Sequence, residues 1–236
     1  MNATLPILRD TTRITPAIED YLKAIYQLRH EEPEQGAVSG QRIAERLGVA
    51  SPSVTNMVKR LRELELVQHE PYRGIELSTE GERIALEVVR HHRLLERYLV
   101  EALGFGWDEV HEEAERLEHH ISETLEARMA TALGDPTVDP HGDPIPDLDG
   151  SITDVAERCL LDVAPGDATI VRRVSDRDPE RLRYLERLGI RPGTAVRLVE
   201  ALPFDGPLRV LVGMDEQVIG RPLAAVIQVA PNDADS

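Results

Sequence analysis

The chain contains very little cysteine and few aromatic residues. Among its 236 residues there is one cysteine, Cys159, and aromatic residues make up 3%. One cysteine excludes a disulfide within the chain and fits the reducing cytoplasm. With so few aromatic side chains, the hydrophobic cores must be built mainly from Leu, Ile, Val and Ala.

Long hydrophobic runs are also missing. No apolar run approaches the roughly 20 residues that a membrane-spanning helix needs. The first residues, MNATLPILRDTTR, lack the apolar stretch and the cleavage site of a signal peptide. We therefore expect a cytoplasmic protein with no membrane partner, and its length suits two or three domains.

Positive charge is scarce, since the net charge is −16. An acidic protein binds nucleic acid poorly unless its binding face is locally basic. The acidic excess is concentrated in residues 80–150, whereas basic residues outnumber acidic ones in residues 38–75. This distribution allows DNA binding in the first third of the chain. A solvated acidic helix surface would explain part of the excess in the middle whatever the function.

Helix-start signals in the first third predict a winged helix-turn-helix over residues 1–78. Thr15-Pro16 combines a capping residue with proline at the first helical position, and apolar residues follow at helical spacing. Two further helices, over 39–47 and 51–66, are separated by a three-residue turn. Residues 67–78 hold two short β-type runs around a Tyr-Arg-Gly turn, which is typical of a wing.

In such a module the helix that begins at Ser51 would enter the major groove of DNA. Its first residues are small and polar and could contact bases, whereas nearby basic residues could contact phosphates. Each basic residue could equally be a solvated surface charge. The candidates for DNA contact are Ser51, Pro52, Ser53, Thr55, Asn56, Lys59, Arg60 and Arg73.

The middle of the chain predicts a helical dimerisation domain over residues 79–140. Thr79 and Glu82 form a capping box that opens a helix to about Leu103. A second helix is expected from Asp108 to about Leu133. Two long amphipathic helices cannot close a core alone, so we expect them to pack against the same helices of a second chain in a homodimer. The apolar stripe of the second helix would contain Val110, Ala114, Leu117, Ile121 and Leu125.

The composition changes again near residue 134. Residues 134–150 are rich in Pro, Gly and Asp, and we interpret 141–155 as a linker. Residues 156–236 predict a small β-rich domain, an SH3-like barrel. The expected fold class is thus mainly α with a β-rich C-terminal domain. The expected strands are 169–174, 195–200, 208–212 and 224–229, with a short helix over 179–188.

Residues that commonly bind metals are concentrated on the two middle helices. His92 and Glu96 are one helical turn apart, and His111, Glu115, Glu118 and His119 are related by steps of three and four, so each set shares a helix face. Carboxylates and imidazoles together suit Mn²⁺, Fe²⁺, Zn²⁺ or Co²⁺. Single residues of this kind are usually solvated surface groups, but six on two adjacent helices favour a metal site. We expect His91, His120 and His141 to lie at the surface or behind the ligands.

Two enzyme signatures are incomplete. Residues 111–115 read His-Glu-Glu-Ala-Glu, and a zinc protease would need histidine where Glu115 stands. Di-iron bundles use Glu-x-x-His, usually twice, and the chain has none. We therefore expect a regulator rather than an enzyme. A metal-dependent hydrolase or oxidase on the acidic helices is the less favoured alternative.

Six stretches of the chain form one recognisable pattern: TPAIEDYLKAIYQL (15–28), IAERLGVASPSVTNMVKRL (43–61), RGIELSTEG (73–81), RHHRLLERYL (90–99), VHEEAERLEHHIS (110–122) and PHGDPIP (140–146). Together they resemble the diphtheria toxin repressor family of metal-dependent transcriptional regulators, close to its manganese-responsive branch. The resemblance extends over nearly the whole chain, including the SH3-like domain of longer members. It implies a homodimeric repressor of metal-uptake genes that binds operator DNA.

The resemblance also implies two metal sites. The primary site would use Asp20, Glu115, Glu118 and His119. The ancillary site would use His92, Glu96 and His111, although His92 serves the primary cluster in manganese-responsive members. Asp178 or Glu180 of the C-terminal domain would complete the ancillary site. Binuclear manganese regulators have glutamate where this chain has Lys23, which cannot ligate while charged.

The ligand types decide which metal is expected. Iron-responsive members typically have methionine at the position of Asp20 and cysteine at that of Glu115. The two carboxylates here favour Mn²⁺, with Fe²⁺ as the alternative. An ion that joins Asp20 to the middle helices would fix the angle of the winged helix. A regulator that uses residues 111–119 only as a dimer surface, without metal, is the third possibility.

Overall fold

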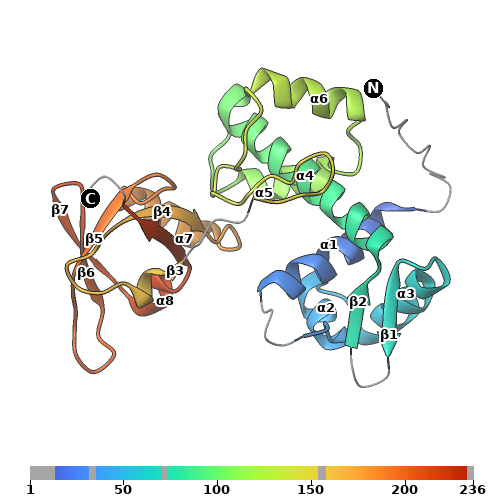
Figure 1. Ribbon diagram of the computed structural model, residues 1–236, viewed down its shortest axis with the longest axis horizontal. Helices are drawn as coiled ribbons and strands as arrows, with labels where there is room; N and C mark the ends of the chain where they lie inside the picture. The colour runs from blue at the N-terminus through green and yellow to red at the C-terminus, as the bar shows by residue number, and fades with distance from the viewer. Residues whose placement is uncertain (1–13, 32–35, 71–73, 154–157, 233–236) are drawn as a thin grey trace. The chain divides into compact units, whose positions relative to one another are not determined.

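The computed structural model describes residues 14–31, 36–70, 74–153 and 158–232. The chain divides into two compact units, residues 1–90 and 91–236, each described by itself below. The division falls inside helix α4 (Thr79–Leu103), which begins in the first unit and continues into the second (Figure 1). None of the helices in the described ranges is long and apolar enough to cross a membrane.

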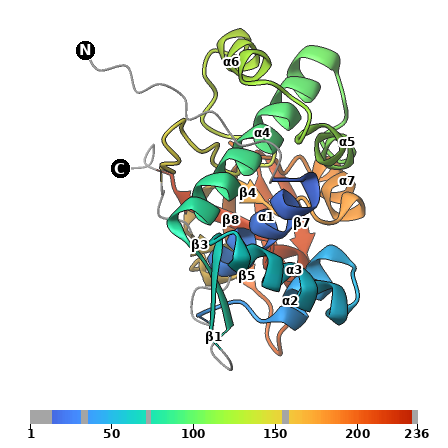
Figure 2. The same ribbon diagram turned by 90° about the vertical axis from the view of Figure 1, so that its right-hand side faces the viewer.

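The first unit is a winged helix-turn-helix, as predicted. Ser39 accepts a hydrogen bond from the backbone N–H of Arg42 at the start of α2, and Gly48, at φ 63°, ends that helix. Figure 2 shows α2 beside α3, with the β1–β2 hairpin on the other side of α3. The elements are α1 (Pro16–Glu31), α2 (Gly40–Leu47), α3 (Ser51–Glu63), β1 (Val67–Glu70) and β2 (Gly74–Leu77).

The hairpin and the helices share one core. β1 and β2 pair antiparallel, with Val67 opposite Leu77. Val38 forms an isolated bridge to Ile75, which ties the segment before α2 to the wing. The fully buried residues Leu22, Ile25, Ile43 and Leu61 come from the three helices, so aliphatic side chains build this core as the composition predicted.

The predicted second helix of the middle region is in fact two helices. After α4 come α5 (Val110–Leu117) and α6 (Glu123–Ala132). The side chain of Ser122 accepts a hydrogen bond from the N–H of Leu125 and starts α6 anew, which explains the break. The predicted apolar stripe is wrong at its end, because Leu125 is 45% exposed. The expected cap, Asp108, is replaced by Glu109.

The Pro/Gly/Asp-rich segment differs from a plain linker because its middle is folded and buried. Val138 bridges to Pro144, and the Oδ1 atom of Asp139 accepts hydrogen bonds from the N–H groups of His141 and Asp143. Asp143 also accepts from Arg93 of α4 and Arg173 of β4, at 3.3 and 3.1 Å. Turn-forming residues thus shape a compact loop here, which we call the 139–143 loop.

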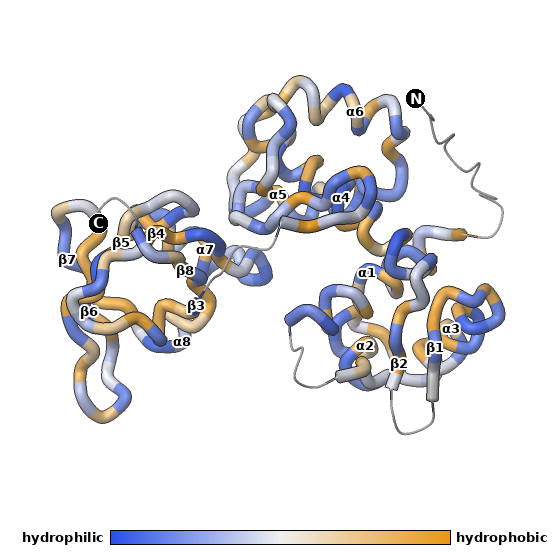
Figure 3. Tube along the Cα trace, in the orientation of Figure 1, coloured by the Kyte–Doolittle hydropathy of each residue, from blue (hydrophilic) through white to orange (hydrophobic). Residues whose placement is uncertain are grey.

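The C-terminal part is a six-stranded antiparallel sheet in the order β3-β8-β4-β5-β6-β7, which confirms the predicted β-rich domain. Its hydrophobic segments lie on the strands, whereas the region of α7 is mostly hydrophilic (Figure 3). The elements are β3 (Arg158–Cys159), β4 (Ala168–Val174), α7 (Pro179–Arg187), β5 (Ala195–Ala201), β6 (Leu208–Val212), β7 (Asp215–Ile219), α8 (Arg221–Ala224) and β8 (Ile227–Pro231).

The sequence patterns missed two strands and misplaced a third. β3 has only two residues and β7 is polar at most positions, so neither shows a hydrophobic pattern. The strand expected over 224–229 begins only at Ile227, because the short helix α8, with Pro222 in its first turn, extends to Ala224.

Candidate metal centre and nucleic-acid interface

His92 lies at the centre of the metal-ligand candidates in the second unit. It is 4% exposed, and helical spacing places its Nε2 atom 3.0 Å from the Oε1 atom of Glu96 one turn later. On the other side of the ring, Nδ1 lies 2.6 Å from Oε2 of Glu118 and 3.7 Å from Oε1 of Glu115. One imidazole therefore faces carboxylates through both of its nitrogen atoms.

The carboxylates on the Nδ1 side come from the end of α5. Glu115 is on the helix, but Glu118 is the residue that follows it, so the prediction that residues 111–119 share one continuous helix is wrong. Glu118 is nevertheless 1% exposed, and its Oε1 atom lies 3.5 Å from Nε2 of His119. We call His92, Glu115, Glu118 and His119 the first cluster.

On the Nε2 side of His92, a second group of ligands draws on the C-terminal domain. His111 Nδ1 lies 3.1 Å from Glu96 Oε1 and 3.2 Å from Oδ2 of Asp176. Asp176 follows β4 and was missed by the sequence patterns. The expected candidates have other roles, since Asp178 caps the N-terminus of α7 and Glu180 is exposed.

A buried histidine and a buried aspartate complete this group. Asp139 and His141 are 2% and 0% exposed, and with Glu96 they can place one ligand atom each within 4.8 Å of one another. The Nδ1 atom of His141 lies 3.6 Å from Oε2 of Glu96. We call Glu96, His111, Asp139, His141 and Asp176 the second cluster.

Two buried atoms of the second cluster indicate that a cation would fit there. Oε2 of Glu96 and Nδ1 of His141 are buried, and no described group forms a hydrogen bond with either. Buried polar atoms rarely lack a hydrogen bond, and a cation bound to both of these atoms would satisfy them. The donor set is also suitable, because carboxylate oxygens and imidazole nitrogens are ligands for divalent transition metals.

The charges of the second cluster are strongly coupled. Burial acts to raise the pKa of Glu96, but the neighbouring imidazoles hold it well below its usual range. Burial lowers the pKa values of His111 and His141, yet the nearby carboxylates raise them to about 10 and about 9. Burial and the charge of Asp143 raise the pKa of Asp139 well above its usual range. Without an ion, protons therefore neutralise part of this acidic group.

Two of the neighbouring histidines are buried, so the surface interpretation is wrong for them. His141 is fully buried, and its Nε2 atom is 2.6 Å from the carbonyl oxygen of Trp107. His91 is 4% exposed, with Nδ1 3.2 Å from the Glu118 carbonyl oxygen and Nε2 3.4 Å from Oε2 of Glu126. His120 is exposed, as one of the two expectations had it.

Asp20, the remaining predicted ligand, is half-buried on α1 in the first unit. The other six predicted ligands, in the second unit, divide between the two clusters. Lys23, also on α1, is 5% exposed.

The predicted DNA-binding helix has one buried and one exposed face. Val54, Val58 and Leu61 of α3 pack into the core of the first unit. The predicted contact residues on this helix are all exposed: Ser51, Pro52, Ser53, Thr55, Asn56, Lys59 and Arg60. Arg73, predicted to be in the wing, lies outside the described residues. The exposed face is therefore available for DNA.

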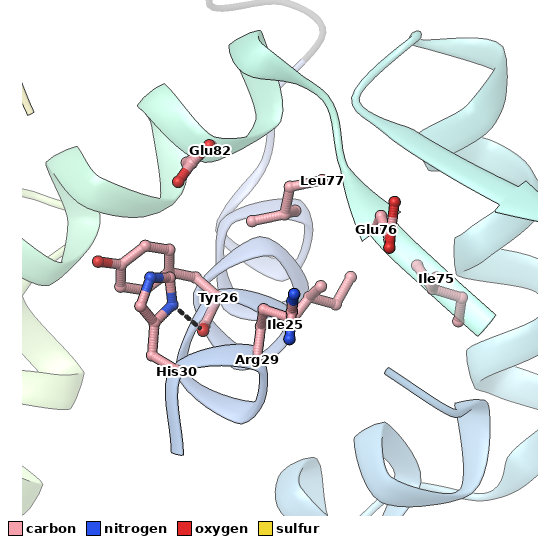
Figure 4. Close-up of a pocket in the computed structure, with 8 residues that line it drawn as sticks. All are labelled: Ile25, Tyr26, Arg29, His30, Ile75, Glu76, Leu77 and Glu82. Atoms are coloured by element: carbon pink, nitrogen blue, oxygen red, sulfur yellow. Dashed lines mark hydrogen bonds between the residues drawn. The ribbon is translucent and has the colours of Figure 1, made fainter. Parts of the chain in front are cut away.

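The first unit also has a pocket of about 460 Å³ between α1, β2 and the start of α4 (Figure 4). In it the rings of Tyr26 and His30 lie 4.0 Å apart, and His30 Nδ1 is 2.9 Å from the Tyr26 carbonyl oxygen. None of the residues that line it is a predicted metal ligand or DNA contact. We therefore assign it no part in the site. Its lining is Ile25, Tyr26, Arg29, His30, Ile75, Glu76, Leu77 and Glu82.

Comparison with known families identifies three matching regions. Residues 13–75 match the N-terminal DNA-binding domain of iron-dependent repressors, and residues 78–147 match the metal-binding and dimerisation domain of the same proteins. Residues 158–231 match the FeoA domain.

Individual relatives agree with these matches. The iron-dependent repressor IdeR of Mycobacterium leprae is 34% identical, over 89% of this chain and 95% of that protein. A manganese-dependent transcriptional repressor solved in complex with manganese is 40% identical, with a TM-score of 0.83 over 91% of this chain and 100% of that one. The manganese regulator SloR is 32% identical, with a TM-score of 0.72 over 93% and 100%. The chain belongs to the iron-dependent repressor family of metal-dependent transcriptional repressors.

Proposed function

We propose that this repressor responds to Mn²⁺ and, when loaded, binds operator DNA as a homodimer in the cytoplasm. The observation that carries the proposal is the donor set around His92, in which every ligand candidate offers a carboxylate oxygen or an imidazole nitrogen. Hard oxygen donors suit Mn²⁺, whereas the one cysteine, Cys159 on β3, belongs to none of the candidate groups among the described residues. Fe²⁺ is the second candidate, because the family includes iron-dependent repressors.

The first cluster is proposed as the regulatory site, with Asp20 as an additional ligand. The support is the resemblance of the Asp20 segment to the family pattern and the buried position of Glu118 beside His92. Asp20 belongs to the DNA-reading unit, whereas Glu115, Glu118 and His119 lie at the end of α5 and just after it, in the second unit. An ion held by both would restrict the orientations of the recognition helix α3.

The second cluster is proposed as a second metal site, which supports the first. The support is that Glu96 Oε2 and His141 Nδ1, both buried, form no hydrogen bond with any described group. His92 contacts Glu96 through one nitrogen atom and Glu118 through the other, so the two sites share a ring. The position of that ring links the two sites.

The proposed homodimer is supported by apolar side chains left exposed on the middle helices. Leu103 at the end of α4 and Leu125 on α6 are 59% and 45% exposed. A two-fold dimer would cover such residues and present two α3 helices to successive major grooves, about 34 Å apart.

Fluorescence anisotropy with a duplex from the protein's own promoter region tests the proposal. The duplex is titrated with protein in Mn²⁺, in anaerobic Fe²⁺, in Zn²⁺ and in chelator. We expect Mn²⁺ to raise affinity by roughly 5- to 150-fold, the usual range of allosteric coupling. Tighter binding in Fe²⁺ than in Mn²⁺ would favour the second candidate.

Two variants show whether the first cluster is responsible. Glu115→Ala should remove most of the metal response. Glu112→Ala is the matched control, because Glu112 is an exposed carboxylate on the same helix that pairs only with Arg116 among the ion pairs described, at 3.5 Å. Equal responses in the two variants would contradict the assignment. A metal-independent regulator would bind the duplex equally well in metal and in chelator. An enzyme would turn over a substrate at a rate that depends on the metal present.

A further inference from the structure

Trp107 belongs to the loop between α4 and α5, yet its side chain is part of the core of the C-terminal domain. It is 3% exposed and packs in the same cluster as Leu182, Leu185 and Ile190. Its Nε1–H donates to Oε2 of Glu186 at 3.2 Å. The loop between α4 and α5 thus contributes one aromatic ring to the core of the β-rich domain.

Besides Glu186, a second polar residue, Arg191, lies over the face of the Trp107 ring. The guanidinium carbon of Arg191 lies 4.8 Å from the centroid of the Trp107 ring, a distance suited to a cation–π contact. Together with the bond to Glu186, this contact fixes the orientation of the indole, so the position of the Trp107 backbone is fixed as well.

The backbone of the same residue holds a member of the second cluster. The carbonyl oxygen of Trp107 is 2.6 Å from Nε2 of His141, and the two rings stack with centroids 5.8 Å apart and an interplanar angle of 21°. A carbonyl only accepts, so Nε2 of His141 must carry hydrogen. Nδ1 is then the atom left to bind an ion, and it is the atom that faces Glu96.

We propose that Trp107 is a positioning residue for the second cluster, which makes ion binding there and docking of the C-terminal domain a single linked equilibrium. This inference rests on the proposed second metal site. The ring fixes the loop to the C-terminal core, and the carbonyl directs His141 Nδ1 at the ion. Groups that orient a ligating histidine in this way typically contribute 10- to 100-fold to metal affinity.

The donors of the second cluster make the linkage reciprocal. Glu96 comes from α4, Asp139 and His141 from the 139–143 loop, and Asp176 from the chain after β4 of the C-terminal domain. Glu96 belongs both to the group with Asp176 and to the group with Asp139 and His141. An ion that binds Asp176 together with Glu96 favours the docked domain, and the docked domain in turn favours ion binding, by the same factor.

The test compares Trp107→Ala with a variant that weakens the same core without contacting His141. Leu185→Ala is that control, since Leu185 is 0% exposed in the same cluster. Isothermal titration calorimetry with Mn²⁺ measures affinity and the number of ions for each full-length protein. We expect both variants to unfold at lower temperature. Only Trp107→Ala should lose affinity at the second cluster, by at least about tenfold.

A conservative variant and a spectroscopic signal complete the test. Trp107→Phe keeps an aromatic ring that can pack in the C-terminal core and hold the loop, so it should restore most of the affinity that Trp107→Ala loses. Because Trp107 is the chain's single tryptophan, its fluorescence reports on this loop directly. Binding of Mn²⁺ should change that fluorescence in the wild type and in Leu185→Ala, but not in His141→Ala.

The outcomes separate the inference from the proposed site. If His141→Ala binds as many ions as the wild type with equal affinity, the second site itself is wrong and the inference fails with it. If His141→Ala loses an ion but Trp107→Ala binds like Leu185→Ala, the site stands and the positioning role of Trp107 is wrong.

Discussion

The Nδ1 atom of His141 lies 3.6 Å from the Oε2 atom of Glu96, and both side chains are fully buried. The separation exceeds a hydrogen bond, so the two groups interact chiefly through charge. Glu96 also faces His92 and His111 through its other oxygen. This one carboxylate therefore connects the histidines of α4, α5 and the 139–143 loop.

Replacement of this carboxylate by an amide should weaken both metal binding and the fold. Glu96→Gln removes the negative charge that the three imidazoles share, and loss of one partner from a buried charged pair costs up to about 3–5 kcal/mol. We expect at least about tenfold weaker ion binding at the second cluster and a lower melting temperature. Calorimetric titration and thermal unfolding measure the two effects.

The control for this variant is Glu101→Gln on the same helix. The side chain of Glu101 is 42% exposed and pairs with Arg97 at the surface, at 2.5 Å, and exposed pairs contribute about 0–1 kcal/mol. Similar losses in the two variants would show that Glu96 has no special place in metal binding.

The stability of the metal-free protein should fall as pH rises from 7 to 10. The pKa values of His111 and His141 are raised to about 10 and about 9 in the folded chain. A histidine whose pKa is higher in the folded than in the unfolded chain stabilises the fold, and it does so fully when the pH is below its ordinary pKa, near 6.5. This stabilisation is lost as pH rises through the pKa of the folded chain. Melting temperatures in chelator at pH 6 to 10 measure the loss.

The same protons must leave when an ion binds to His111 and His141. Bound Mn²⁺ should therefore reduce the pH dependence of melting, and binding should release protons near pH 7.5. Calorimetry in buffers of different ionisation enthalpy counts them. Metal-free melting that stays level up to pH 10 would contradict the charge state assigned here.

Gly142→Ala should disturb the second cluster through the backbone. Gly142 has φ +94°, and a Cβ atom there would lie 1.9 Å from the carbonyl oxygen of Arg172. The 139–143 loop would have to move away from β4, at a cost of about 1–3 kcal/mol or more. We expect a lower melting temperature together with weaker binding of the second ion.

Gly134 provides a control with the same kind of backbone. It has φ +72°, but no atom lies within 4 Å of the position that a Cβ atom would take there. Gly134→Ala should cost about 1–2 kcal/mol of backbone strain and leave ion binding unchanged. If both glycine variants lose the second ion equally, general destabilisation is the cause.

The sequence predicted best those features that depend on neighbouring residues. Helix caps such as Ser39 and turns such as Gly48 act locally, so the helix-turn-helix was predicted correctly. The pair His92 and Glu96 was found because helical spacing alone brings the two together. Such patterns among residues close together in the sequence can be recognised without knowledge of the tertiary structure.

The features that were missed depend on contacts between distant segments. Asp176 meets His111 only because the C-terminal domain docks on the helical region, and no periodic pattern marks it. His141 stood in a segment interpreted as a linker, although the Asp-x-His pair at 139 and 141 was a signal. The break before α6 was overlooked because the cap of Ser122 competes with a continuous apolar stripe.

Exposed residues of α3 should affect DNA binding in two distinct ways. Lys59→Ala, at a predicted phosphate contact, should weaken binding to all sequences alike and reduce the slope of log affinity against log salt by about 1. Asn56→Ala, at a predicted base contact, should relax discrimination by about 1–3 kcal/mol at one base pair. Anisotropy with operator and scrambled duplexes at several salt concentrations separates the two.

Arg62→Ala serves as the control, because Arg62 is exposed on the same helix but is not a predicted contact. If it changes the salt dependence as much as Lys59→Ala, the basic charge of the helix acts as a whole and no single phosphate contact is assigned.

The central claim is that ion binding and operator binding share one equilibrium. It is tested most directly by measuring the affinity for Mn²⁺ with and without saturating operator duplex. Linkage requires DNA to tighten Mn²⁺ binding by the same factor by which Mn²⁺ tightens DNA binding, roughly 5- to 150-fold. Equal reciprocal factors that disappear in Glu118→Gln are the predicted result. An affinity for Mn²⁺ that is the same with and without operator would contradict the account.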